Sequence, residues 1–550
     1  MFSPQISLDS STDATAETHT PLTPPLMRRP WAVAAGITSL ALLPLLVLLV
    51  KCFVSGSYTP WGDDALLELD VRDVGRHAIL LGPYSRFGFR HPGPLYEYLL
   101  AIPYWIRGGT PPGLNLGAGL INMAAISGMA TIAWRRGRWL LLIGTLLLVG
   151  AFSLQRGMAD DFLYRPWNPY VTVLPFGCLL FICWEFSRAQ RWALPTALLI
   201  GSFLVQSHLG YLPVVTTLIL VATALAFRTL RAQWTGDERR PVWRMLSWSV
   251  GVMAAAWILP AIETVIHWPG NLAKIASFQF HTAPDQTLRS SAGVIARSFG
   301  NFPASALHTQ QLNDSTFAHG ALLGLPVVLL GIAFGYIAVR YRASDALRFG
   351  CLVVTILTVA SIALSRVVGP LYEYLTRWVQ MGTIATLLFP IVVMTDPVMR
   401  NRWKRTQQAT LAILAVGLVI VTAINTVHSV QLQWRNEIPE QQIATFANAI
   451  NASLRGSTAP VIIDGNTPST FALEVGVAAE LRRNGHRVYF EPDYSNDVGA
   501  RNVVTPSTRG TGIVLGGEND LKRLEDLPGA TRLGVEHGIY VYRFEWNAGR

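Results

Sequence analysis

The sequence predicts an α-helical membrane protein with about eleven membrane-spanning helices and a small α/β domain at its C-terminal end. The 550 residues are 51% hydrophobic and only 14% charged, with a mean hydropathy of +0.34. These values are typical of polytopic membrane proteins. Apolar runs close to the roughly 20 residues that a spanning helix needs recur up to about residue 427. Beyond that point the pattern changes to short β-type segments around one amphipathic helix.

The expected spans follow one another with short connections. They lie near residues 31–54, 115–134, 139–153, 169–186, 193–208, 211–228, 246–266, 320–339, 349–367, 379–395 and 409–427. Alternate connections are rich in arginine, which is typical of cytoplasmic loops. These basic connections are residues 135–138, 187–192, 229–244, 340–348 and 400–405. A single topology in the cell membrane accounts for all of them, with the N-terminus in the cytoplasm and the C-terminal domain outside.

This topology leaves outer segments at 55–114, 154–168 and 267–319, and an outer C-terminal domain at 428–550. Residues 1–30 are rich in Ser, Thr and Pro and predict a disordered cytoplasmic tail before the membrane domain at 31–427. The apolar segment 92–105 is expected to lie along the membrane or re-enter it. If it crossed, the arginines of 135–138 would lie outside and every later loop would be inverted.

The C-terminal region predicts a small independent domain. APVIIDG, HRVYFEP, TGIVLGG and GIYVYRFE are typical of strands, and PSTFALEVGVAAELRRNG is typical of a helix between the first two. The region contains no Gly-rich phosphate-binding motif.

The net charge of +10 belongs largely to the cytoplasmic loops. No basic stripe accompanies it, so we expect no nucleic-acid partner. The four cysteines lie in or beside apolar spans and predict no disulfide framework.

The first outer segment carries the strongest functional signal. Asp63 and Asp64 directly follow the first span and the sequence Pro-Trp-Gly. A carboxylate beside a hydroxyl can accept its proton while the hydroxyl attacks a sugar carbon. The later acids Glu68, Asp70 and Asp73 are expected to form the solvated face of a short amphipathic helix.

Further polar residues beside spans are candidates for the same site, because charge next to a bilayer is costly and often functional. Asp160, Asp161 and Arg165 lie in the second outer loop, beside an aromatic belt that does not explain them. His208 is either a structural histidine or a ligand, and Glu263 lies near the outer end of a span. Arg377 either binds a phosphate or pairs with a carboxylate such as Glu373 or Glu263.

One span, an acidic pair, a His-Pro turn and a juxtamembrane helix occur here in that order. The arrangement resembles the GT-C superfamily of polyprenyl-phosphate-dependent glycosyltransferases, especially the protein O-mannosyltransferase and aminoarabinose-transferase branch. The matching residues are Asp63-Asp64 and His91-Pro92, with Gly93-Pro94 in place of the second proline. Asp160 or Asp161 matches the acid of the second outer loop. The resemblance covers 31–230 in its motifs, and Asp64 departs from the usual Glu.

The resemblance implies inverting transfer of a sugar from a polyprenyl phosphate to an extracytoplasmic glycan, lipid or protein acceptor. Asp63 would be the general base, and Arg86, Arg90 or Arg377 would hold the donor phosphate, with His91 beside them. Some members use a divalent cation, Mg²⁺ or Mn²⁺, which the acid-rich loops would permit. The candidate residues are then expected to meet in one cavity at the outer face, where membrane lipid is also a partner. Two other functions remain open, a transporter or flippase of a lipid-linked polar molecule and a non-catalytic cell-envelope assembly subunit.

Overall fold

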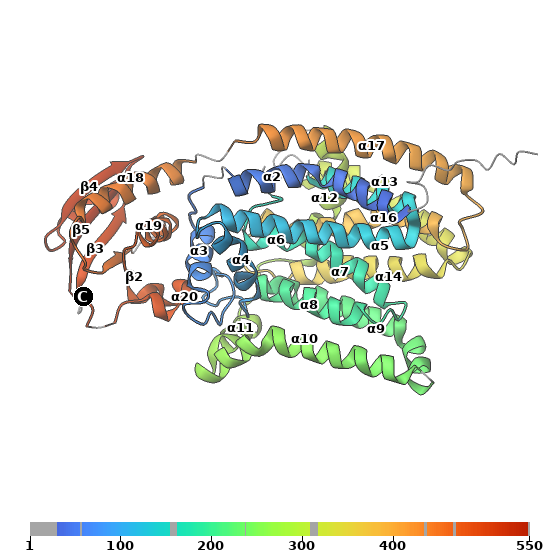
Figure 1. Cartoon of the computed structure of the whole chain (residues 1–550), viewed down its shortest axis with the longest axis horizontal. Coiled ribbons are helices and arrows are strands. Elements are labelled where there is room, and N and C mark those ends of the chain that lie inside the picture. The colour runs from blue at the N-terminus through green and yellow to red at the C-terminus, as the bar shows by residue number, and fades with distance from the viewer. Residues whose placement is uncertain are drawn as a thin grey trace, which may run out of the picture.

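The computed structural model describes residues 30–54, 58–153, 162–236, 238–307, 317–433, 437–465, 469–505 and 507–547. A long helical bundle occupies one side of the molecule, and a mixed sheet with its helices lies at one end of that bundle (Figure 1). Helices α3 and α4 lie between the two parts. The expected N-terminal tail falls outside the described residues up to position 29.

The bundle is formed by helices whose bounds largely follow the expected spans. These are α1 (Pro30–Ala41), α2 (Leu43–Val54), α5 (Pro112–Ser153), α6 (Asn168–Val171), α7 (Val173–Phe186), α8 (Ala193–Ser207), α9 (Leu212–Thr235), α10 (Arg239–Ile266), α13 (Phe317–Arg340), α14 (Ser344–Leu364), α15 (Glu373–Thr376), α16 (Gln380–Thr395) and α17 (Lys404–Gln431). Within the described ranges, seven helices are long and apolar enough to cross a membrane, and the pair α1–α2, bent by 57°, makes an eighth. The protein is therefore a multi-pass membrane protein, and the count of eleven spans is not confirmed.

The two expected spans 115–134 and 139–153 are the two helical parts of α5, which meet at a kink at Arg138 (φ 51°, ψ −136°) in the expected connection. The expected outer loop 267–319 differs from a simple loop, because it contains two helices, α11 (Gly270–His281) and α12 (Leu288–Leu307). Helix α12 packs against α13, α14 and α16, and a hydroxyl–hydroxyl hydrogen bond of 3.0 Å joins Ser298 to Thr383. Polar residues interrupt its apolar pattern, so its sequence does not reach the hydropathy of a span.

Helix α4 (Leu95–Ile106) lies where the bundle meets the sheet domain. Its 12 residues extend about 18 Å, well short of the roughly 30 Å hydrocarbon core. One side buries Tyr96 and Tyr104, and the other exposes Leu99, Ile102 and Ile106. These features agree with the expectation that 92–105 lies along the membrane and does not cross it.

The C-terminal domain contains a five-stranded sheet in the order β2-β1-β3-β5-β4. Its elements are α18 (Ile438–Ser453), β1 (Val461–Asp464), α19 (Phe471–Arg483), β2 (Val488–Phe490), α20 (Ser495–Val498), β3 (Gly510–Gly516), α21 (Leu521–Glu525), β4 (Thr531–Glu536) and β5 (Ile539–Trp546). Strands β1, β2 and β3 are parallel, with Ile462 opposite Tyr489 and Gly512, while β5 is antiparallel to β3 and β4. The four expected strands and the helix α19 are confirmed. The edge strand β4 was not expected, because TRLGVE lacks a run of apolar residues.

Helix α3 (Asp63–Asp73) joins the two parts of the protein. Its residues Leu66 and Leu69 belong to the core of the C-terminal domain, together with Ile443 and Phe446. The backbone N–H of Gly62 donates to the carbonyl of Ala472 over 3.0 Å, which fixes the start of α3 beside α19. From Asp64 to Asp73 the helix is therefore largely enclosed by protein.

The expectation that Glu68, Asp70 and Asp73 form a solvated face is wrong. All three side chains are buried, and arginines from elsewhere in the chain neutralise them. The ion pairs are Glu68–Arg483, Asp70–Arg90, Asp70–Arg501 (2.9 Å) and Asp73–Arg501 (3.3 Å). Buried carboxylates need such partners because desolvation is costly. Three of these four pairs join α3 to the C-terminal domain.

Candidate active site

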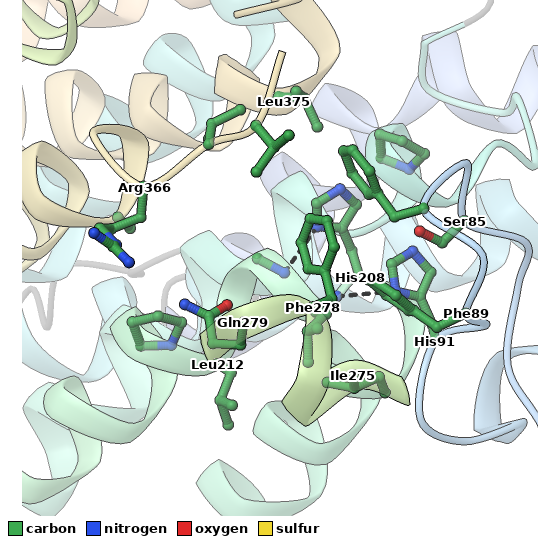
Figure 2. A pocket seen from close by; sticks show the side chains of 18 of the residues that line it. Ser85, Phe89, His91, His208, Leu212, Ile275, Phe278, Gln279, Arg366 and Leu375 are labelled. Carbon is green, nitrogen blue, oxygen red and sulfur yellow. Dashed lines mark hydrogen bonds between the residues drawn. The ribbon is translucent and has the colours of Figure 1, made fainter. Parts of the chain in front are cut away.

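A cavity of about 980 Å³ opens beside the N-terminal end of α3. Its walls come from α3, the loop before α4, the α8–α9 junction, α11, and the segment between α14 and α15 (Figure 2). One part is lined by ionisable and hydrogen-bonding side chains, and the other is lined by apolar side chains of α9 and α14. The cavity is thus suited to a molecule with a polar head and an apolar tail.

Asp63 is the carboxylate that lines this cavity. The indole N–H of Trp167 donates to its Oδ2 over 2.8 Å. Asp63 is exposed to the open cavity, yet the surrounding protein partly desolvates its carboxylate and so raises its pKa. The Trp167 hydrogen bond lowers this pKa, and neighbouring Asp64 raises it. Gly62, at φ 56°, makes the turn that aims Asp63 at the cavity, and other residues rarely adopt this backbone conformation. A carboxylate with a raised pKa in such a place is suited to general base catalysis.

Asp64 faces away from the cavity and is buried. Its Oδ2 accepts hydrogen bonds from the hydroxyl of Tyr58 and from Arg165 Nε, the latter at 3.3 Å. Arg165 also lies over the rings of Trp167 and Tyr170, at 5.3 and 5.8 Å. This arrangement fixes the loop that carries Trp167, and neither Asp64 nor Arg165 lines the cavity.

His91 and His208 face each other across the cavity wall, with ring centroids 5.2 Å apart. The backbone N–H of Leu209 donates to His91 Nδ1, and that of Gly210 donates to His208 Nδ1, both over 3.2 Å. An Nδ1 that accepts a hydrogen bond leaves the proton of a neutral imidazole on Nε2. Burial, with His208 and Arg90 nearby, lowers the pKa of His91 well below its ordinary value. The pair therefore offers neutral N–H donors near physiological pH.

Two exposed arginines, Arg86 and Arg366, also line the cavity. Arg86 lies over the rings of Phe87 and Tyr372, at 4.8 and 4.9 Å. Arg366 approaches from the side opposite His91 (Figure 2). Neither forms an ion pair within the described part of the chain. Their guanidinium groups are thus available to an anion.

Arg366 was missed by the sequence analysis, which assigned it to the span 349–367. A signal for it was present, because arginine at the outer end of an apolar run opposes the usual charge bias of membrane loops. Asn168, which follows Trp167 and also lines the cavity, carried no such signal.

The apolar part of the cavity runs between α9 and α14, which pack against each other. Its lining residues here are Leu212, Pro213, Thr216 and Thr217 of α9, and Val359, Ile362 and Ala363 of α14. Leu212 and Ile362 are about half exposed on the surface of the bundle. The cavity therefore opens onto an apolar part of the outer surface of the bundle.

Three other expected site residues have protein partners and do not line the cavity. Arg90 is buried, pairs with Asp70 and donates to the carbonyl of Gly82 over 2.9 Å. Glu263 accepts the backbone N–H of Asn271 over 3.2 Å. Arg377 pairs with Glu373 over 3.0 Å and lies 4.6 Å from the ring of Tyr170, behind the cavity wall. Asp160 and Asp161 lie outside the described residues.

The candidate divalent cation has no ligand set among the described residues, which contain no group of three or more His, Cys, Asp or Glu side chains placed to hold a metal. The Oδ2 atoms of Asp63 and Asp64 already accept hydrogen bonds from Trp167, Tyr58 and Arg165. Since Asp160 and Asp161 are not described, Mg²⁺ or Mn²⁺ stays a prediction.

The helical bundle, helices α3 and α4 and the C-terminal domain together form the fold seen in GT-C glycosyltransferases. The chain is similar over 94% of its length to the crystal structure of ArnT from Cupriavidus metallidurans bound to undecaprenyl phosphate. The TM-score is 0.55, the sequence identity is 12%, and 98% of the ArnT chain is covered. The apo structure of the same ArnT gives a TM-score of 0.53 at 12% identity, with 93% and 98% of the two chains covered. No protein-family model matches the sequence, and no curated protein matches it.

Proposed function

We propose that the protein is a membrane glycosyltransferase that moves a sugar from a polyprenyl-phosphate donor to an acceptor hydroxyl outside the cytoplasm. One observation carries the proposal: a single cavity joins the carboxylate of Asp63 to the guanidinium groups of Arg86 and Arg366 and continues as an apolar groove. A base, cations for a phosphate and a path for a prenyl chain are the three elements that this transfer needs. ArnT, whose fold this chain shares, has been crystallised with undecaprenyl phosphate.

In the proposed reaction, the acceptor oxygen attacks C1 of the sugar from the side opposite the phosphate. The C1–O bond to the phosphate breaks, its electron pair leaves with the polyprenyl phosphate, and the configuration at C1 inverts. Asp63 accepts the proton of the attacking hydroxyl. Arg86 and Arg366 offset the negative charge that remains on the leaving phosphate. His91 and His208 donate hydrogen bonds from Nε2 to the sugar or the phosphate.

The test measures transfer with purified protein, a radiolabelled polyprenyl-phosphate sugar and a cell-envelope acceptor extract. Asp63→Asn keeps the shape of the side chain and the Trp167 contact but cannot accept the proton. We expect a loss of about a hundredfold or more, in the range of general base catalysis. Asp526→Asn, an exposed residue of the C-terminal domain, is the matched control. Full turnover of D63N at unchanged folding would contradict the proposal.

Transport and binding measurements with the same labelled lipid distinguish the other two functions. A flippase would move the labelled lipid across a vesicle membrane without breaking the sugar–phosphate bond, and an assembly subunit would bind no donor.

The second part of the proposal is that the C-terminal domain lies outside the cytoplasm. The arginine-rich connections, at the end of the bundle opposite this domain, support the orientation. Ser507 and Arg240 are both exposed, one in the C-terminal domain and one at the start of α10. A membrane-impermeant maleimide should label Ser507→Cys in intact cells and Arg240→Cys only after permeabilisation. The reversed pattern would contradict this orientation.

A further inference from the structure

A second cavity, of about 420 Å³, lies at the C-terminal end of α3, between α3 and the C-terminal domain. Its lining contains five arginines and two histidines but one carboxylate. These residues are Arg72, Arg76, Arg482, Arg487, Arg501, His77, His486 and Asp73. The cavity is therefore strongly cationic, in contrast to the mixed lining of the larger one.

The carboxylates near this cavity do not balance its arginines. Arg501 contacts Asp70 at 2.9 Å and Asp73 at 3.3 Å, and Arg482 contacts Asp73 at 4.0 Å. The remaining three arginines have other contacts. Arg72 donates to the Arg482 carbonyl (3.0 Å), Arg487 donates to the Thr458 carbonyl (2.9 Å), and Arg76 lies 5.2 Å from the ring of Trp105. Within the described residues, none of these three has a carboxylate partner, so a positive charge remains for a ligand to neutralise.

The position of the cavity indicates where that ligand comes from. Trp105, over which Arg76 lies, belongs to α4, whose outer face exposes Ile102 (64%) and Ile106 (66%). An apolar helix face of this kind at the end of a membrane bundle is covered by lipid, and Trp and Arg side chains concentrate at the headgroup layer. We therefore expect Arg76 to lie at the level of the lipid phosphates.

We propose that this cavity binds the phosphate of an anionic membrane lipid headgroup. Guanidinium groups bind phosphate oxygens through charge-assisted, often bidentate hydrogen bonds. Arg76 comes from the membrane side and Arg487 from the C-terminal domain, so one headgroup would join the domain to the bilayer surface. Asp63 and Asp73 are the two ends of α3, about 15 Å apart along the helix axis. The lipid site is thus separate from the proposed donor site and does not rest on the proposed sugar transfer.

The test uses the full-length protein in neutral detergent and measures lipid binding by native mass spectrometry. The probes are phosphatidylglycerol, phosphatidylcholine and inorganic phosphate. Arg76→Gln with Arg487→Gln removes two cavity charges. Arg523→Gln with Arg532→Gln removes the same charge from α21 and β4, whose arginines do not line the cavity.

We expect phosphatidylglycerol to bind the wild type and the control in preference to phosphatidylcholine, and to bind R76Q/R487Q at least about tenfold more weakly. Equal phosphatidylglycerol binding by both double variants would overturn the proposal. Binding of inorganic phosphate as tight as that of phosphatidylglycerol would also overturn it, since the site would then take a free anion. An anionic glycan fragment serves as a fourth probe, and tighter binding of this fragment than of phosphatidylglycerol would assign the cavity to an acceptor instead of a lipid.

Discussion

Asp63 and Asp64 are neighbours in the chain, yet the first lines the larger cavity and the second is buried behind it. Trp167 donates to Asp63, and Arg165, two residues earlier, donates to Asp64. One short loop therefore holds both carboxylates. Arg165 offsets the negative charge of the buried Asp64 carboxylate. Asp63 can therefore gain or lose a proton while the charge of Asp64 stays compensated. The two aspartates thus have separate roles, one proposed as the base and one in positioning the loop.

The Trp167 hydrogen bond gives a prediction about pH. This bond stabilises the charged form of Asp63 and so lowers a pKa that burial raises. In Trp167→Phe the pKa of Asp63 should rise further, so the acidic limb of the rate profile should move to higher pH. A pH series of transfer rates measures this shift, with Trp248→Phe, an exposed residue of α10, as the control. An acidic limb that stays in place would separate Asp63 from the rate-limiting proton transfer.

The two cavity arginines give a prediction about donor affinity. Charge-assisted hydrogen bonds contribute roughly 1.5–3 kcal/mol. Arg366→Gln and Arg86→Gln should therefore each raise the donor KM by about tenfold to a hundredfold. Arg366→Lys should keep part of the affinity, because it retains the charge but loses the planar fork. Steady-state kinetics with a polyprenyl-phosphate sugar measure all three variants.

Arg377 provides the contrast for this experiment. Its contacts with Glu373 and Tyr170 favour a positioning role, while the sequence also suggested a phosphate ligand. If Arg377 has the positioning role, Arg377→Gln and Glu373→Gln should each lower the thermal stability, and the double variant should lose less than the sum of the two. The donor KM should then stay unchanged. A rise in the donor KM like that of R366Q would make Arg377 a phosphate ligand.

The sequence predicted the elements that depend on local patterns. Apolar runs predicted the bundle, alternation predicted four strands, and the charge of residues 135–138 predicted that α4 does not cross the membrane, which agrees with its length of 12 residues. It also selected Asp63, because an acid after a first span is a local signal. It could not predict that Glu68 and Asp70 would be buried, since their partners Arg483 and Arg501 lie more than 400 residues away.

The same reason explains the incomplete prediction of the site. A search for polar residues beside spans selected Arg90, Glu263 and Arg377. The sequence already offered Glu373 as a partner of Arg377, four residues away. The partners of Arg90 and Glu263, by contrast, become visible only in the folded chain. Arg366 lacks a carboxylate partner within the described residues and reaches the cavity because of the turn after α14.

The buried pair Asp70–Arg90 gives a prediction about stability. Arg90 is 5% exposed and Asp70 is 2% exposed. Asp70→Asn would leave Arg90 with a buried charge and without its carboxylate, a change that usually costs about 3–5 kcal/mol. It would also remove one partner of Arg501 in the C-terminal domain. Thermal unfolding should show a clear loss of stability against D526N, and an unchanged melting temperature would contradict this role of the pair.

Glu474 on α19 gives a prediction about pH and stability. Its side chain is fully buried and accepts hydrogen bonds from the hydroxyls of Thr470 (2.7 Å) and Tyr494. Burial raises the pKa of Glu474 from 4.5 to about 7. The folded domain therefore binds this proton more tightly than the unfolded chain, and the resulting stabilisation, up to about 3 kcal/mol, is present in full below pH 4.5.

This stabilisation should be lost as the pH rises through 7. Glu474→Gln resembles the protonated acid at every pH, so the variant should lose less stability than the wild type between pH 5 and 8. Unfolding of the C-terminal domain can be followed by fluorescence over this range in the full chain. Burial and the nearby Asp464 raise the pKa of Glu491 to about 8. Glu491 therefore adds to the decrease in the free energy of unfolding with rising pH, and Glu491→Gln measures its contribution. If the stability of E474Q falls with pH as steeply as that of the wild type, Glu474 is ionised in the folded domain and its environment favours the charge.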